Sequence, residues 1–314
     1  MRVVDLGDPP TGPQPATGVV VAVGSAADIA SAAAQPWLER AAFTLSEDEV
    51  TDRRVVTVES AATAVTELTT RLQKWPQAST ICDDVLRTSA ASTLGGLVME
   101  SLAYSTLQAG GEFAAWLRKR GPAAARAQPD PVLADRDGGT LHVRFNRPSR
   151  HNAFSNDARA ALLEALDVAS YDPSIDEIVL SGNGPSFCSG GDLAEFGSFA
   201  DPASAHVARM QHSPALVLDD LTGRLGERCR ARVHGQVLGS GLEMAAFCGW
   251  VAAHRDSVLG LPELSLGLIP GAGGTVSVAR RVGRWRTAYL VLSGRTIDAA
   301  TGLGWGLVDA VDAG

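Results

Sequence analysis

The feature that most constrains the fold is an alternation of strand-like and helix-like segments over the second half of the chain. TLHVRF at 140–145 alternates apolar and polar residues, NDARAALLEALDVAS at 156–170 has the spacing of an amphipathic helix, and IDEIVLSG at 175–182 is typical of a buried strand. RCRARVHG at 228–235 and GWVAAH at 249–254 are further strand candidates that adjoin helical runs. Strands that alternate with helices predict an α/β fold in which helices cover a sheet.

The first part of the chain shows a different pattern. Residues 1–16 are rich in Pro and Gly, so we expect a loose arm, and GVVVAVG at 18–24 predicts a buried strand. The spacing predicts a helix at 25–43, and Pro36 breaks it or opens a second turn. These residues match no pattern that indicates a function.

From residue 54 to residue 120 the apolar spacing is mostly helical. One helix has an apolar face made by four side chains, which are Ala62, Val65, Leu68 and Leu72. Two more helices are predicted in 93–120, separated near Gly110 and Gly111. Residues 121–131 have the Pro, Ala and polar content of a linker.

Composition excludes some classes of function. The chain has 314 residues, a net charge of −8 and a pI near 5.3, and this balance argues against a general nucleic-acid binder, which needs a basic face. Its four cysteines show no CxxC spacing, so we expect reduced thiols, as in a cytosolic protein. The apolar run GVVVAVG at 18–24 is far shorter than the ~20 residues of a membrane span, so we expect a cytoplasmic protein without a membrane segment. No metal site is expected.

Two Gly-rich turns each follow a strand-like run and precede a helical one. They are FCSGGDL at 187–193 and VLGSGLE at 237–243. Peptide N–H groups at the start of a helix have no intrahelical partner, so two such turns that face each other would form a site for a developing oxyanion. The alternative is that small residues only allow helix and strand to pack closely, and one such turn alone is weak evidence.

Two glutamates lie in Gly-rich, apolar surroundings near these turns. Glu243 falls in the first helical turn after Gly239, and Glu263 lies within GLPELSLGLIPGAGGT at 260–275. Apolar surroundings raise the pKa of a carboxyl group, and two such groups with different pKa values suit acid and base roles. The alternatives are a favourable charge at a helix N-terminus for Glu243 and a solvated loop carboxylate for Glu263; spacing alone does not decide between these readings.

Together these segments resemble the crotonase, or enoyl-CoA hydratase/isomerase, superfamily. FNRPSRHNAFS at 145–155 resembles the family's first motif, GNGPSFCSGGDL at 182–193 its GxGxxFxAGADL segment, and VHGQVLGSGLEMAAFC at 233–248 its second Gly-rich turn and helix. LPELSLGLIPGAGGT at 261–275 is similar to PExxLGxxPGxGGT, and GRTIDAATGLGWGLVDAV at 294–311 to the closing motif. The motifs follow one another in the family's order, which makes the resemblance specific.

The resemblance implies the roles of four residues. The peptide N–H groups of Gly191 and Ser240 would form the oxyanion hole for a CoA thioester carbonyl, although the family commonly has Ala and Gly at these positions. Glu243 and Glu263 match the two glutamates of the family's hydratases, which hold one water and deliver hydroxide to Cβ and a proton to Cα. Neither departure removes an N–H group.

Five further residues are predicted to bind CoA: Trp116, Lys119, Arg147, Arg150 and Asp192. Trp116 and Lys119 match the Phe and Lys of the family's AFxEKR segment, and the alternative is a solvated basic helix end. Arg147 and Arg150 are candidates for the CoA phosphates, and the alternative is surface ion pairing. The resemblance implies no separate cofactor, because CoA is part of the substrate.

The resemblance also predicts an unusual order of domains. Residues 1–53 would be an extension of unknown role, 54–122 a helical region similar to the family's C-terminal helices, 123–130 a linker, and 131–314 a crotonase-like ββα spiral. A helical region that normally follows the core would thus precede it, as in a circular permutation. The alternative is an unrelated helical extension.

The function that the resemblance implies is that of an acyl-CoA enzyme of fatty-acid metabolism, an enoyl-CoA hydratase that adds water to a 2-enoyl-CoA. An isomerase, hydrolase or retro-Claisen lyase acting on a CoA thioester is an alternative, because fold alone does not determine chemistry. A catalytically idle acyl-CoA-binding subunit is another. The expected partners are the thioester substrate and further copies of the chain, in a homotrimer or hexamer.

Overall fold

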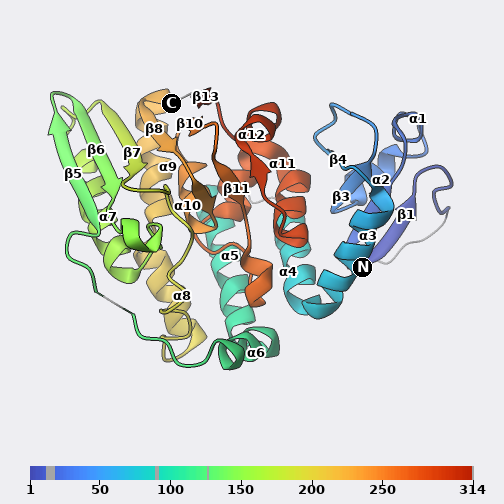
Figure 1. The fold of residues 1–314 in the computed structure, drawn as a ribbon, viewed down its shortest axis with the longest axis horizontal. Helices are drawn as coiled ribbons and strands as arrows, with labels where there is room; N and C mark the ends of the chain where they lie inside the picture. The colour runs from blue at the N-terminus through green and yellow to red at the C-terminus, as the bar shows by residue number, and fades with distance from the viewer. Residues whose placement is uncertain (12–17, 89–91, 126, 313–314) are drawn as a thin grey trace.

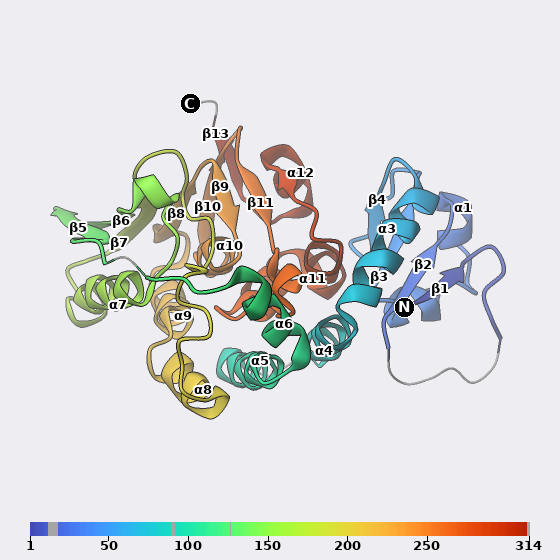
Figure 2. The ribbon, with the colours of Figure 1, turned by 60° about the horizontal axis from the view of Figure 1, so that its bottom comes forward.

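The protein is described by a computed structural model that covers residues 1–11, 18–88, 92–125 and 127–312 (Figure 1). Parts of the expected arm and linker, residues 12–17 and residue 126, lie outside the described residues. The structure has an α/β core and a smaller N-terminal unit, and Figure 2 shows α3 and α4 between the N-terminal sheet and the rest of the chain.

The N-terminal unit is a parallel sheet in the order β1-β2-β3-β4 with two short helices. Its elements are β1 (Arg2–Asp5), β2 (Val20–Val23), α1 (Ala26–Ile29), α2 (Gln35–Arg40), β3 (Phe43–Ser46) and β4 (Val55–Thr57). The expectation of a loose arm was wrong for β1, because these residues pair with β2. The domain boundary expected after residue 53 falls inside this sheet, since β4 pairs with β3.

Four helices follow, and polar caps define where two of them begin. They are α3 (Ala61–Lys74), α4 (Pro76–Arg87), α5 (Thr93–Gln108) and α6 (Gly111–Arg120). The side chains of Ser60 and Ser92 accept hydrogen bonds from the first turns of α3 and α5. Leu68 and Leu72 are buried as predicted, whereas Ala62 is exposed because the buried face of α3 is turned toward Ala61 and Ala64.

The core contains a six-stranded sheet in the order β13-β10-β8-β7-β6-β5, in which only the β5–β6 pair is antiparallel. A three-stranded sheet, β12-β11-β9, lies beside it. The strands are β5 (Val132–Asp137), β6 (Thr140–Phe145), β7 (Glu177–Gly182), β8 (Cys229–Val233), β9 (Gln236–Leu238), β10 (Trp250–His254), β11 (Val258–Gly260), β12 (Ile297–Asp298) and β13 (Ala310–Asp312).

Helices and short 3-10 turns connect these strands. The helices are α7 (Asn156–Tyr171), α8 (Pro202–Gln211), α9 (Pro214–Leu225), α10 (Ser240–Ala245), α11 (Gly274–Ser293) and α12 (Ala299–Trp305), and the 3-10 turns are η1 (Pro148–Arg150), η2 (Gly226–Arg228) and η3 (Glu263–Leu266). The strands predicted around TLHVRF, IDEIVLSG, RCRARVHG and GWVAAH are therefore confirmed. No helix in the described ranges is long and apolar enough to cross a bilayer.

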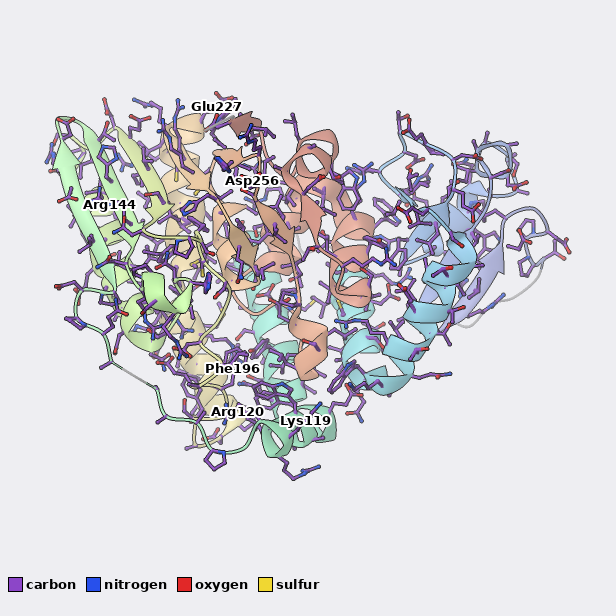
Figure 3. All side chains as sticks on the ribbon, viewed as in Figure 1. Lys119, Arg120, Arg144, Phe196, Glu227 and Asp256 are labelled. Atoms are coloured by element: carbon purple, nitrogen blue, oxygen red, sulfur yellow. The ribbon has the colours of Figure 1, made fainter. Side chains whose placement is uncertain are left out.

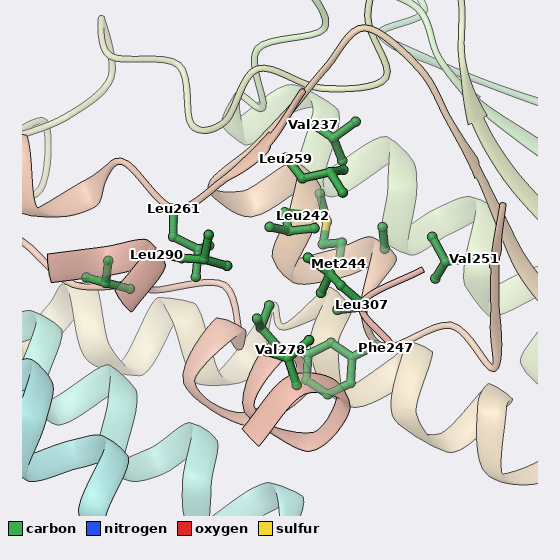
Figure 4. Close-up of a cluster of buried hydrophobic side chains, with 14 of the residues drawn as sticks. Val237, Leu242, Met244, Phe247, Val251, Leu259, Leu261, Val278, Leu290 and Leu307 are labelled. Atoms are coloured by element: carbon green, nitrogen blue, oxygen red, sulfur yellow. The ribbon is translucent and has the colours of Figure 1, made fainter. Parts of the chain in front are cut away.

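The short helix α10 is held in place by the apolar core around it. All six of its residues are buried, and Figure 4 shows Leu242 and Met244 among side chains from β9, β11 and α11. Burying one such side chain stabilises a fold by about 1.5–3 kcal/mol. This packing fixes the N-terminus of α10, which carries two of the predicted site residues.

The longest helix, α11, joins the core to the segments that precede it. It packs against α3, α4, α5, α10 and β3. The indole N–H of Trp285 donates to the carbonyl of Leu38 at 3.0 Å, in a buried contact between α11 and the N-terminal unit. The helical region 54–122 therefore lies on the core of its own chain.

Candidate active site

The two Gly-rich turns predicted from the sequence lie against each other. Cys188 N–H donates to Gln236 O at 3.1 Å, and Leu238 N–H donates back to Cys188 O at 3.0 Å. Gly190 has φ +100° and Gly239 has φ +48°, a backbone region that favours glycine. A Cβ atom on Gly239 would lie 3.6 Å from the Gly190 Cα, so the two turns are in close contact.

Gly191 and Ser240, which lie in these turns, line the same cavity. Within the part of the chain that the structure describes, neither N–H group has a hydrogen-bond acceptor. Ser240 is the first residue of α10, where an N–H lacks an intrahelical partner and the helix dipole adds partial positive charge. The arrangement can therefore stabilise an oxyanion placed between the two turns.

Glu243 lies one turn into α10 with its side chain buried at the cavity. Its Oε2 accepts hydrogen bonds from Ala272 N–H at 2.7 Å and Gly274 N–H at 2.8 Å. Burial, and then the charges of Glu263 and Glu100, raise the pKa of Glu243 well above its usual value, while the two N–H donors act in the opposite direction. The Glu243 carboxyl group is therefore held at a fixed position, in surroundings that favour its protonated form.

Glu263 lies in η3, close to the Gly239 turn, and lines the same cavity. Only 9% of the residue is exposed, so the alternative of a solvated loop carboxylate is wrong. Its Oε2 has no hydrogen-bond partner among the described residues, and burial raises the pKa of the side chain to about 8. A Cβ on Gly239 would lie 2.5 Å from the Glu263 Oε1, which shows how closely this carboxyl approaches the turn.

A third carboxyl group, Glu100 on α5, lies at the same cavity and was not identified from the sequence. It accepts hydrogen bonds from Gly273 N–H at 2.7 Å, Thr275 N–H at 2.9 Å and the Thr275 hydroxyl at 2.7 Å. Burial raises the pKa of Glu100 to about 7. The available signal was a glutamate within the otherwise apolar run GGLVMESLAY of a predicted helix.

The cavity itself has a volume of about 130 Å³. The residues that line it come from both the helical region and the core, and they include Glu100, Tyr104, Gly191, Ser240, Glu243 and Glu263. A Cβ on Gly271 would lie 2.5 Å from the Tyr104 ring. Helix α5 therefore packs directly on the segment that connects η3 to α11. Within the described ranges, His, Cys, Asp and Glu side chains form no cluster of three suited to a metal ion.

Arg147 and Asp192, both predicted to contact CoA, form a buried ion pair. The Arg147 Nη2 to Asp192 Oδ2 distance is 2.9 Å, and the side chains are 3% and 1% exposed. Although burial alone would raise it, the hydrogen bonds from Arg147 and the Ala194 N–H lower the pKa of Asp192. The pair supports the turn that follows Gly191, and its contact with CoA stays a prediction.

Arg150, Trp116 and Lys119 lie nearer the surface. Arg150 is about half exposed, 3.3 Å from the other Asp192 oxygen, so its guanidinium retains access to solvent. Trp116 stacks on Phe113 and contacts the ring of Phe196, with ring centroids 5.8 and 6.0 Å apart. Lys119 is exposed, and Figure 3 shows it on α6 beside Arg120, at the same end of the molecule as Phe196.

Comparison with known proteins points to one family. Residues 135–314 match the family model described as enoyl-CoA hydratase/isomerase. The chain is 34% identical over 187 residues to 2,3-dehydroadipyl-CoA hydratase of Escherichia coli, covering 57% of this chain and 68% of that one. It is 31% identical over 184 residues to a probable enoyl-CoA hydratase of Mycobacterium tuberculosis, covering 58% and 68%.

Solved structures give the same result. An enoyl-CoA hydratase from Thermoplasma volcanium matches with a TM-score of 0.51 and 32% identity, over 59% of this chain and 72% of that one. An enoyl-CoA hydratase/carnithine racemase from Magnetospirillum magneticum matches with a TM-score of 0.53 and 26% identity, over 59% and 68%.

Proposed function

The chain belongs to the enoyl-CoA hydratase/isomerase family, and on that premise we propose that it adds water to 2-enoyl-CoA thioesters. One observation carries this proposal: two buried carboxyl groups, Glu243 and Glu263, and two unpartnered N–H groups, those of Gly191 and Ser240, line one cavity. The hydratases among its relatives, including the one from Escherichia coli, support it.

The N–H groups of Gly191 and Ser240 bind the thioester oxygen. As water adds to Cβ, the electrons of the double bond move toward this oxygen, and the two N–H groups stabilise the enolate that forms. Their benefit is largest after the charge has developed, which lowers the barrier rather than only tightening substrate binding.

Glu243 acts as the base and Glu263 as the acid. Burial and the neighbouring acids raise the pKa of Glu243 as well, but its two N–H donors favour the charged form, so we assign the negative charge of the pair to Glu243. Its carboxylate takes one proton from water while the water oxygen bonds to Cβ. Glu263, whose Oε2 has no hydrogen-bond donor among the described residues and whose pKa is raised to about 8, is protonated near neutral pH and gives its proton to Cα. The enolate collapses to the 3-hydroxyacyl thioester, and proton exchange through Glu243 and Glu263 restores the starting state.

The helical region 54–122 performs the part that the family's C-terminal helices perform, which amounts to a circular permutation. Supporting this, α5 lines the cavity through Glu100 and Tyr104, and α6 packs against η3, which carries Glu263. A homotrimeric or hexameric assembly in the cytoplasm, with CoA contacts at Arg150, Trp116 and Lys119, completes the proposal.

The test is hydration of crotonyl-CoA, followed by loss of the enoyl-thioester absorbance. Glu243→Gln and Glu263→Gln keep the side-chain shape and should each lower kcat by about 10²-fold or more. Glu227→Gln is the matched control, because Glu227 is exposed and lies at the opposite end of the molecule from Phe196 in Figure 3.

Undiminished turnover in either site variant would refute the assigned roles. Tight CoA-thioester binding by the unaltered protein without any turnover would instead identify the catalytically idle subunit. Turnover of the thioester without loss of the double bond would indicate isomerase or hydrolase chemistry.

A further inference from the structure

Two arginines from different helices line the cavity that holds the glutamate pair. Arg159 lies in the first turns of α7, and Arg209 lies near the end of α8. Burial lowers the pKa of both guanidinium groups, and the charge of Arg159 lowers the pKa of Arg209 further. Neither residue belongs to a motif that the family resemblance singled out.

Arg209 is held rigidly, but by uncharged atoms. It donates to Ser101 Oγ at 3.0 Å, Ser101 O at 3.1 Å, Gln108 Oε1 at 3.0 Å and the Ser105 hydroxyl, all on α5. Its Cζ lies 4.7 Å from the centroid of the Tyr104 ring. These contacts fix the orientation of the guanidinium without neutralising its charge.

Arg159 makes no hydrogen bond or ion pair with any of the residues that the structure describes. Its Cζ lies 5.9 Å from the centroid of Phe154, and Phe154 bridges to Gly191 of the oxyanion turn. The acid that acts on it through space is Glu195, but a Glu195 oxygen already accepts the Asn156 N–H at 2.7 Å. Arg159 thus faces the cavity with its donors unused.

Acids also line this cavity, but none of them forms an ion pair with Arg159 or Arg209 among the described residues: Glu100 is bound by the Gly273 and Thr275 N–H groups, and Glu195 by the Asn156 N–H. The two guanidinium groups therefore lack a direct anionic partner. Removing a charge from water without a partner carries a large desolvation penalty, and like charges repel. A guanidinium group presents paired N–H donors that match a planar carboxylate. An anionic group placed between Arg159 and Arg209 would relieve both penalties while the other end of the ligand lies at the Glu243–Glu263 pair.

We propose that Arg159 and Arg209 bind a carboxylate at the far end of the acyl chain, so that the preferred substrates are 2-enoyl-CoA thioesters of dicarboxylic acids. This inference rests on the proposed hydratase function and names its substrate class. Arg159 is the specificity-determining residue, because Arg209 also joins α8 to α5.

The first experiment measures hydration of paired 2-enoyl-CoA substrates over a series of chain lengths. One member of each pair ends in a carboxylate and the other in a methyl group. In the unaltered protein, kcat/KM should favour the carboxylate member at one chain length by about 10-fold or more, and Arg159→Gln should lower this ratio by about 10- to 100-fold, as expected for losing a charge-assisted hydrogen bond.

Two further variants make the result specific. Arg159→Lys retains the charge and should keep part of the preference. Arg255→Gln removes an exposed arginine adjacent to Asp256, which lies away from Phe196 in Figure 3, and should leave the ratio unchanged. Far-ultraviolet circular dichroism and thermal unfolding establish that each variant is folded.

Calorimetric binding of the matching saturated acyl-CoA thioesters separates the inference from the proposed function. Preferential binding of the carboxylate-ended thioester, lost in Arg159→Gln, supports the inference even where no hydration occurs. Equal binding of both members, or an equal loss of affinity for both in Arg159→Gln, overturns it; the second outcome would mean that Arg159 binds CoA itself. Hydration of methyl-ended substrates alone would leave the proposed function standing and remove the inference.

Discussion

The space beside Gly191 gives a quantitative test of the oxyanion turn. A Cβ atom on Gly191 would lie 2.8 and 2.9 Å from two atoms of the Phe196 ring. Carbon atoms in ordinary contact are about 3.5–4.0 Å apart, so the ring or the turn would have to move by roughly 0.6–1.2 Å. The Phe196 ring thus occupies the room that the family's usual alanine would need.

Two contacts hold Phe196 in place and resist its movement. Phe196 contacts Trp116, and its carbonyl accepts a hydrogen bond from Arg120 at 2.9 Å. Overpacking of this kind costs about 1–3 kcal/mol. If the turn moves and the ring does not, the Gly191 N–H is displaced. The same free energy then corresponds to a loss of roughly 5- to 150-fold in kcat/KM.

The assay is a double-mutant cycle on enoyl-CoA hydration. Gly191→Ala should lower kcat/KM within that range, and Gly191→Ala combined with Phe196→Ala should recover most of the loss relative to Phe196→Ala alone. Gly223→Ala is the control, because a Cβ there has no neighbour within 4 Å. Additive effects of the two substitutions would refute the steric explanation, and full activity of Gly191→Ala would show that the ring moves freely.

Two further predictions follow from charges buried at and near the site. Glu100→Gln removes a negative charge that raises the pKa of Glu243 and Glu263, so the acid limb of the pH profile of kcat/KM should move to lower pH; an unchanged limb, as expected for the exposed control Asp84→Asn, would contradict this coupling. Asp192→Asn deprives the buried Arg147 of its carboxylate and should lower the free energy of unfolding by about 3–5 kcal/mol in a denaturant titration. Asp219→Asn, at the more exposed ion pair with Arg280, should cost about 1 kcal/mol or less, and equal losses at both sites would contradict the effect assigned to burial.

The elements that could be predicted from the sequence are those with one buried face, because burial of one face gives the apolar residues a regular spacing. Helix α7 and strands β6 and β7 have regular apolar faces, and all three lie where expected. The edge strands β1 and β5 were missed because their side chains are largely exposed, so no apolar alternation records them. Their positions depend on pairing with β2 and β6, which is a tertiary effect.

Only those residues of the candidate site that lie in a family motif could be predicted from the sequence. Gly191, Ser240, Glu243 and Glu263 lie in family motifs, and the structure brings all four to one cavity. Arg159 has no such signal, because an arginine on an amphipathic helix is usually solvated. Its importance comes from facing a cavity shared with Arg209, a residue 50 positions away in the numbering of the chain.

Glu100 links the helical region to the core at the candidate active site. Its buried carboxyl group is satisfied by the N–H groups of Gly273 and Thr275, at the start of α11. Without the core, the carboxyl would lose these partners, and without α5, the first turn of α11 would lose its acceptor. This mutual dependence is what the proposed circular permutation requires, because the helical region must then complete the cavity of its own core.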